Sequence, residues 1–184
     1  MEVTTNRPPL DKTNMYGSFV GKTAFYKDQL YFEVKNQEKD IPSSEKVISI
    51  GLCELNFSAV DFLGEKASVG YHNTGIIQFE GESEESKKDE YAYGPSTVIG
   101  CGVEATKGKS LQFTEDGKLI SQQKLLVYFT KNGKRIYEKE LTLRWDGLFP
   151  SVCMVKNYSV RLLNFYPETK AIRQQLQLEK EERE

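Results

Sequence analysis

The stretch LVYFTKNGKRI, Leu126–Ile136, carries the clearest local structural signal in the chain. Strand-forming residues precede Asn132-Gly133, and a second run follows with Lys134, Arg135, Ile136 and Tyr137. A two-residue type I′ turn needs positive φ at both central positions, and Asn-Gly is the pair that most often supplies it. The stretch therefore predicts a β-hairpin.

A second stretch repeats the pattern a few residues earlier. FTEDGKLI, Phe113–Ile120, matches FTKNGKRI, Phe129–Ile136, with Asp116-Gly117 in place of Asn132-Gly133. The sequence predicts two successive hairpins. Because there is no third copy and the spacing is too short for a solenoid unit, shared turn chemistry explains the echo better than repeat architecture.

Composition narrows the class of protein. With 184 residues, of which 38% are hydrophobic, the chain is long enough for one domain with a substantial core. Lys and Arg total 25 against 27 Asp and Glu, a net charge of -2, so no basic field favours nucleic acid as a partner. No apolar run approaches the ~20 residues of a membrane span, and MEVTTNRPPL lacks the features of a signal peptide. We expect an intracellular protein, cytoplasmic or nuclear, that is monomeric.

The cysteines fit that compartment. Cys53, Cys101 and Cys153 are dispersed in strand-like contexts, SIGLCEL, VIGCGVE and PSVCMV. Their odd number and wide spacing argue against a disulfide framework and against half of a zinc site. We interpret them as buried free thiols. Cys153 as a nucleophile would need a nearby base, and the chain has one histidine.

Short strand-like runs with turn signals between them fill most of the chain. They are Ser18–Thr23, Leu30–Lys35, Val47–Cys53, Ala67–Tyr71, Ile76–Phe79, Thr97–Val103, Ser110–Thr114, Lys124–Thr130, Lys134–Glu138, Ser151–Val155 and Val160–Phe165. No helical pattern long enough for a parallel crossover separates them, so the sequence predicts an all-β sandwich of two antiparallel sheets. The residues expected to be buried are Phe32, Val34, Ile48, Ile50, Val98, Ile99, Val127, Phe129, Val152 and Phe165.

Three segments lack strand character. In YPETKAIRQQLQLEKEERE, Pro167 and Glu168 suit a first helical turn and strong helix formers follow, which predicts a short C-terminal helix in a tail of residues 167–184. Ile172 and Leu176 form one narrow apolar stripe, able to dock one or two turns on the domain; a partner-binding helix is the alternative. The runs Gln37–Lys46 and Glu80–Glu90 are interpreted as polar, solvated loops.

The sequence contains few residues in patterns typical of a catalytic site. His72, in SVGYHNTG, is the single histidine, so any triad or Cys–His pair must include it, and sites built on several imidazoles are excluded. The glycine-rich stretches fit neither a dinucleotide fingerprint nor a P-loop, and the acids show no spacing typical of a glycosidase pair. We expect no cofactor and no metal, and a structural or recognition role for His72.

The order of the motifs is more informative than any single residue. LYFEVKN, ISIGLC, SVGYHNTG, YGPSTVIGCGVE, LVYFTKNGKRI, GLFPSV and VRLLNF resemble, in sequence and in order, the SPRY domain, the core of the B30.2 module. The resemblance covers about Leu30 to Phe165 and is strongest to the subgroup in Ran-binding-protein-M-like scaffolds. It implies one bent β-sandwich domain over residues 1–166, followed by the tail at 167–184.

The resemblance also implies a function. SPRY domains are non-catalytic protein–protein interaction modules, so we expect an adaptor or scaffold that recognises a short peptide or a partner domain without a cofactor. The chain departs from the family in four places. The N-terminal part TTNRPPLDKTNMYGSFVGKTAFYKDQ is short for the usual opening strands. Phe62 or Leu63 must occupy the place of a tryptophan, residues 107–123 form a hairpin insertion, and Val155, Lys156 and Asn157 stand where peptide-binding relatives carry Trp-Gly. Peptide specificity therefore does not transfer, and deletion of Lys107–Gln123 is expected to leave a folded protein.

The predicted partner-binding site is one loop end of the sandwich, with Asn132 expected at the opposite end. Its residues are Asn56, Phe57, His72, Asn73, Tyr93, Lys156, Asn157 and Tyr158, chosen as loop or turn positions rich in aromatic and amide groups. The alternative is a β-sandwich enzyme or small-ligand binder, which would show an enclosed pocket containing His72 and convergent acids.

Overall fold

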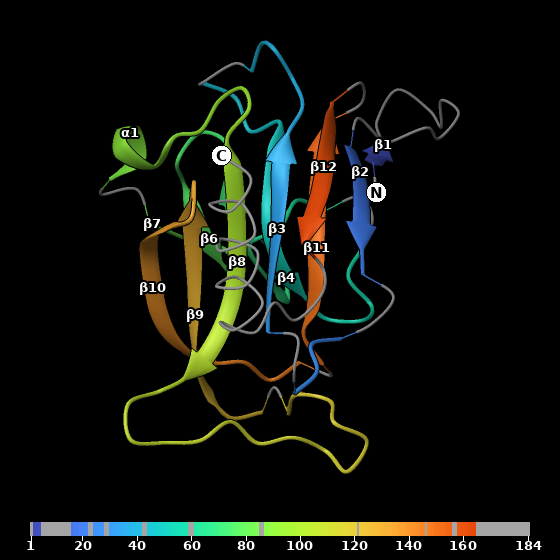
Figure 1. The fold of residues 1–184 in the computed structure, drawn as a ribbon, viewed down its shortest axis with the longest axis vertical. Coiled ribbons are helices and arrows are strands. Elements are labelled where there is room, and N and C mark those ends of the chain that lie inside the picture. The colour runs from blue at the N-terminus through green and yellow to red at the C-terminus, as the bar shows by residue number, and fades with distance from the viewer. Residues whose placement is uncertain are drawn as a thin grey trace, which may run out of the picture.

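The computed structural model shows two antiparallel sheets packed face to face (Figure 1). It describes residues 2–4, 16–21, 24–27, 30–41, 44–58, 61–84, 87–120, 122–145, 147–155 and 158–164. Every strand pair in this part of the chain is antiparallel, as the sequence predicts.

Sheet A and sheet B each contain six of the described strands. The order in sheet A is β1 (Glu2–Thr4), β12 (Ser159–Asn164), β3 (Tyr31–Asn36), β8 (Val98–Ala105), β9 (Lys124–Lys131) and β10 (Lys134–Thr142). The order in sheet B is β2 (Tyr16–Val20), β11 (Phe149–Val155), β4 (Ile48–Cys53), β5 (Ser68–His72), β6 (Ile77–Phe79) and β7 (Glu82–Glu84). One short helix, α1 (Lys88–Tyr91), is also present.

The hairpin predicted for Leu126–Ile136 is confirmed. β9 and β10 pair across Asn132-Gly133, and both turn residues have positive φ, 51° and 75°. The prediction for Glu80–Glu90 is wrong in part, because this charged run contains β7, paired with β6, and α1. Ser110–Thr114 is not a strand; it contributes one isolated bridge, Phe113 to Leu119. Within the described residues no helix has the length and apolar character needed to cross a bilayer.

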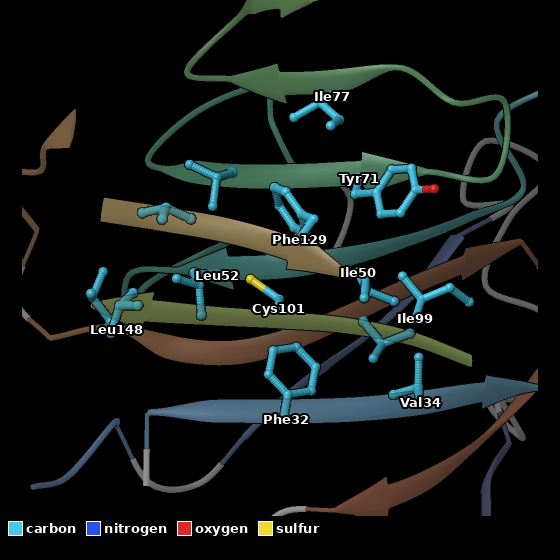
Figure 2. Packing of buried hydrophobic residues seen from close by; sticks show 14 of the residues in the cluster. Phe32, Val34, Ile50, Leu52, Tyr71, Ile77, Ile99, Cys101, Phe129 and Leu148 are labelled. Carbon is cyan, nitrogen blue, oxygen red and sulfur yellow. The ribbon is translucent and has the colours of Figure 1, made fainter. Parts of the chain in front are cut away.

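Side chains of both sheets meet in one apolar core (Figure 2). Eight of the ten predicted core residues are buried: Phe32, Val34, Ile48, Ile50, Ile99, Val127, Phe129 and Val152. Val98 is only half-buried, and Phe165 lies outside the described residues. The expectation for Val98 is wrong because consecutive side chains of a strand point to opposite faces, and Ile99 takes the core position. Cys53, Cys101 and Cys153 are buried and free, as predicted.

Strand register sorts the connections into two ends of the sandwich. In sheet B, Ser49 pairs with His72 and Cys53 pairs with Ser68, so the chain enters β4 at one end and leaves it at the other. The end that holds residues 37–41, 44–47, 73–76, 87–97 and 132–133 is called the Asn73 end. The end that holds residues 24–27, 30, 54–58, 106–120, 122–123, 143–145 and 147–148 is called the Phe57 end (bottom of Figure 1).

The predicted hairpin insertion closes the Phe57 end. The Leu119 amide donates to the Phe25 carbonyl and the Lys27 amide donates to the Gly117 carbonyl, both at 2.9 Å. Leu119 is buried in the main core beside Phe25 and Leu148. The buried position of Leu119 argues against the expectation that residues 107–123 can be deleted without loss of folding.

Candidate functional site

The turn after β5 is held by one buried amide side chain. Asn73 Oδ1 accepts hydrogen bonds from the Val47 and Ile48 amides at 2.8 and 3.1 Å, and Asn73 Nδ2 donates to the Glu45 carbonyl at 2.9 Å. The Asn73 carbonyl also accepts the Tyr93 amide at 3.0 Å. Asn73 therefore joins the β5–β6 turn to the chain entering β4 and to the segment before β8.

Tyr93 makes a second set of ties at the same end. Its hydroxyl donates to the carbonyls of Ile48 and Tyr71 at 3.1 and 3.2 Å, and its ring lies edge-on to Tyr71. The Tyr71 hydroxyl in turn donates to the Tyr91 carbonyl. Burial raises the pKa of Tyr93 well above its usual value, so the hydroxyl stays protonated and able to donate.

Further side chains tie the remaining turns at the Asn73 end to one another. Asn36 Nδ2 donates to the Gly94 carbonyl at 2.8 Å, and Glu38 Oε1 accepts from the amide and hydroxyl of Ser159. Lys131 Nζ donates to the carbonyls of Glu90 and Ala92 at 3.1 and 2.7 Å. The turns of the Asn73 end are thus fixed by directional bonds before any partner arrives.

The outer face of sheet B carries the residues that a catalytic interpretation would need. Cys153, Ser49 and His72 lie in one row across β11, β4 and β5, since Cys153 pairs with Ser49 and Ser49 pairs with His72. The segment 61–67, called the strap, covers this row. Phe62 of the strap stacks on His72 with 5.4 Å between ring centroids.

A glycine lets the strap approach the sheet. A Cβ on Gly70 would lie 2.4 Å from the Leu63 carbonyl oxygen, so only glycine permits this contact. Phe62 and Leu63 are both buried, in a second apolar cluster with Cys53 and Cys153. The two residues expected to replace the family tryptophan therefore both belong to the strap and pack against sheet B.

Electrostatics oppose acid–base or nucleophilic chemistry in this row. Burial, and to a smaller extent Lys46, lowers the pKa of His72 to about 3; an interaction with Gln78 outside good hydrogen-bond geometry acts weakly in the other direction. Burial raises the pKa of the Cys153 thiol far above its usual value. Near neutral pH the imidazole is uncharged and the thiol is protonated. In the described part of the chain no cluster of His, Cys, Asp and Glu is arranged to hold a metal ion.

The structure divides the predicted site residues between the two ends. His72, Asn73 and Tyr93 lie at the Asn73 end but are buried, at 0%, 1% and 4% exposure, so they do not present side chains to a partner. Asn73 and Tyr93 instead bond to the backbone of the turns. Tyr158 is half-buried at the same end, and Lys156 and Asn157 lie outside the described residues.

Two expectations about the ends are wrong. Asn56 and Phe57 lie at the opposite end, because they follow Cys53, the last residue of β4. Asn132, expected opposite the site, lies at the Asn73 end: its amide donates to the Val98 carbonyl and its Oδ1 accepts the Val98 amide.

Sequence reasoning also missed three residues that fix the turns: Asn36, Glu38 and Lys131. Asn36 at the end of a strand-like run is a signal that could have been recognised, because an Asn there often bonds neighbouring backbone. Lys131 gives no such signal, since its two acceptors are about forty residues away in the chain.

Comparisons with known proteins identify the family to which this fold is similar. The SPRY domain family model matches residues 29–166. SPRY domain-containing protein 3 of Homo sapiens and of Pongo abelii are each 27% identical over 139 residues, which is 75% of this chain and 28% of the relative. The chain thus spans little more than a quarter of the length of these curated relatives.

Solved structures agree on the fold. The crystal structure of a human SPRY domain has a TM-score of 0.63 and 26% identity and covers 84% of this chain and 86% of its own. The SPRY domain of human HERC1 has a TM-score of 0.54, with 84% and 85% coverage and 12% identity, and shows the fold alone.

Two six-stranded antiparallel sheets packed face to face define a β-sandwich domain. The chain belongs to the SPRY domain family. Membership of the Ran-binding-protein-M-like subgroup stays a prediction.

Proposed function

We propose that this chain is a non-catalytic protein–protein interaction module that recognises a short peptide or a partner domain through the turns of its Asn73 end. In the cell the chain would act as part of an adaptor or a scaffold. One observation carries the proposal: buried Asn73 and Tyr93 bind the backbone of several separate turns. A preorganised surface loses less conformational entropy on binding, which favours recognition of a flexible ligand.

The contacts themselves are assigned to residues at the tips of these turns. Ser96 and Asn132 are exposed with positive φ, 56° and 51°, and Tyr158 is half-buried at the same end, just before β12. Lys156 and Asn157 belong to the same connection on sequence grounds. Tyr is enriched among residues that dominate binding energy, so Tyr158 is the strongest candidate. The family and the low charge support a protein partner; a monomer in the cytoplasm or nucleus remains our expectation.

The experiment compares matched variants of the two ends. The double variant Tyr158→Ala with Lys156→Glu alters the Asn73 end, and Leu55→Ala with Asn56→Ala alters exposed residues of the Phe57 end. Each protein is used to capture partners from cell extract, with identification by mass spectrometry, and affinity for a purified partner is then measured. Thermal melts confirm that both variants fold.

We expect the first variant to lose at least about tenfold in affinity, which is ~1.4 kcal/mol, and the second to bind like the unaltered chain. The reverse result would place the site at the Phe57 end. Equal loss in both folded variants would show that neither end alone carries recognition.

A further inference from the structure

On the outer face of sheet A, two tyrosines lie on either side of a strand that has glycine at two positions of this face. Tyr31, Gly102 and Tyr128 form one row across β3, β8 and β9, and Glu33, Gly100 and Thr130 form the next. The two rings stack above Gly102, with centroids 5.8 Å apart and planes 12° from parallel. The Tyr31 hydroxyl donates to Glu33 Oε1 at 2.6 Å and lies 2.7 Å from Thr130 Oγ1. These six residues are called the tyrosine platform.

The glycines are required for the platform to form. A Cβ on Gly100 would lie 2.1 Å from the Tyr31 hydroxyl oxygen and 2.4 Å from Thr130 Oγ1, and a Cβ on Gly102 would lie 2.6 Å from Cζ of Tyr128. Both tyrosines are only partly exposed, and burial is the largest cause that raises the pKa of Tyr128, to about 12. The platform therefore offers two stacked aromatic rings beside a carboxylate and a hydroxyl group, on the face of the sheet that is turned away from the core.

A charged border and the strand spacing limit the width of a ligand that the tyrosine platform can hold. On the β9–β10 side, Arg135 lies over the Tyr128 ring at 3.9 Å and pairs with Glu104 and Glu138. Between this charged border and β12 lie three strands, whose outer two are about 10 Å apart at the usual strand spacing. A single helix has a diameter of about 10 Å with its side chains, so the platform has room for one helix.

We propose that the tyrosine platform is the docking site for this chain's own segment 167–184, bound as a helix with Ile172 and Leu176 on the tyrosine rings. The path of the chain supports this occupant. β12 ends at Asn164, which pairs with Glu33 of the platform, so residues after β12 start beside it. The narrow Ile172–Leu176 stripe matches a platform one helix wide.

Charge favours the same occupant. Glu33 is 9% exposed although it belongs to the outer face of sheet A. In a helix, Arg173 follows Ile172 on the flank of the stripe, where its guanidinium can reach the Glu33 carboxylate. A second apolar feature lies alongside, because Leu163 of β12 is 38% exposed.

The first experiment measures side-chain protection in the full chain. Tyrosines are nitrated with tetranitromethane and each site is quantified by peptide mass spectrometry, with half-buried Tyr26 at the Phe57 end as internal reference. We expect Ile172→Asp with Leu176→Asp to raise nitration of Tyr31 and Tyr128 by about tenfold relative to Tyr26. The matched control Leu178→Asp, which lies off the stripe in a helix, leaves both rates unchanged.

A charge exchange tests the orientation. Glu33→Arg and Arg173→Glu each raise nitration of the platform tyrosines, and the double exchange returns it toward the original rate. Thermal melts of each variant exclude general unfolding. As a second control, Tyr26 and the buried Tyr93 keep their nitration rates in a folded variant.

Three results overturn the proposal. Fast nitration of Tyr31 and Tyr128 in the unaltered chain would show that the platform is open to another partner. Protection that disappears on dilution would assign it to a second copy of the chain. Equal effects of Leu178→Asp and the stripe variant would remove the specific docking of Ile172 and Leu176.

Discussion

The two ends of the sandwich are closed by different physical means. At the Phe57 end, Phe25, Leu119 and Leu148 are all buried in the main core, and backbone hydrogen bonds join Phe25 to both Leu119 and Leu148. At the Asn73 end, the amide of Asn73 and the hydroxyl of Tyr93 are buried instead, and they bond to backbone groups of neighbouring turns.

The proposed division of the molecule into a stabilising end and a binding end rests on this difference. Apolar burial is non-directional and stabilises in proportion to area, so it closes an end without fixing each turn precisely. Side-chain hydrogen bonds are directional, so they fix the backbone of turns whose tips stay exposed. The apolar end suits a scaffold and the polar end suits a binding surface.

The largest effect is expected at the apolar end. Leu119→Ala should lower the free energy of unfolding by about 2–5 kcal/mol, because it leaves a cavity among Phe25 and Leu148. Urea denaturation measures the change. The neighbouring control Lys118→Ala removes a surface ion pair with Asp116 and should cost less than ~1 kcal/mol. Deletion of residues 107–123 should destabilise at least as much as Leu119→Ala; unchanged stability would show that the hairpin does not close this end.

The next effect, of similar size, is expected from Asn73. Asn73→Ala removes the acceptor of the Val47 and Ile48 amides and should cost about 2–6 kcal/mol, since each of the two buried unsatisfied amides costs about 1–3 kcal/mol. Asn73→Asp keeps the acceptor and should retain more stability than the alanine variant in the same denaturation experiment. The control at the other end, Asn56→Ala, is exposed and should change stability by less than about 0.5 kcal/mol. Equal effects of Asn73→Ala and Asn56→Ala would remove the distinction between the ends.

The fold was predictable because its determinants are local. Alternation of apolar and polar residues gave most strands, and Asn132-Gly133 gave the hairpin with both positive φ values. β7 was missed because its three residues, Glu82–Glu84, are all polar, and the strand exists through pairing with β6. Tertiary pairing here overrides the composition of the segment.

The composition of the site was predictable in part, and its placement was not. Loop residues rich in aromatic and amide groups did include Asn73 and Tyr93, but their burial depends on residues 45–48, about 25 to 45 positions away. Assignment of Phe57 and Asn132 to ends requires the register between strands distant in the chain, which no local pattern contains. Leu119 did carry a signal, as the apolar residue after the Asp116-Gly117 turn, where an exposed hairpin would favour a polar one.

The smallest expected effect is a pH dependence of stability that comes from burial of the His72 imidazole near the Asn73 end. His72 is fully buried beneath Phe62, and neither ring nitrogen has a hydrogen-bond partner in good geometry among the described residues. Ser49, its neighbour in the row, also has a hydroxyl without such a partner. A neutral imidazole tolerates this site better than a charged one, and Lys46 nearby adds to the preference.

The pH dependence follows from the sign of the shift. The pKa of His72 is about 3 in the folded chain and 6.5 at its ordinary value, so the unfolded chain binds the proton first as pH falls. Stability from this group is complete above pH 6.5 and declines below it, by about 1.4 kcal/mol between pH 7.5 and pH 5.5. Urea denaturation at the two pH values measures the loss. His72→Gln cannot titrate, so its own loss over this range should be smaller by the same amount, whatever its stability at pH 7.5. An identical pH dependence in both proteins would show that His72 is solvated, and the buried row beneath the strap would then not exist in solution.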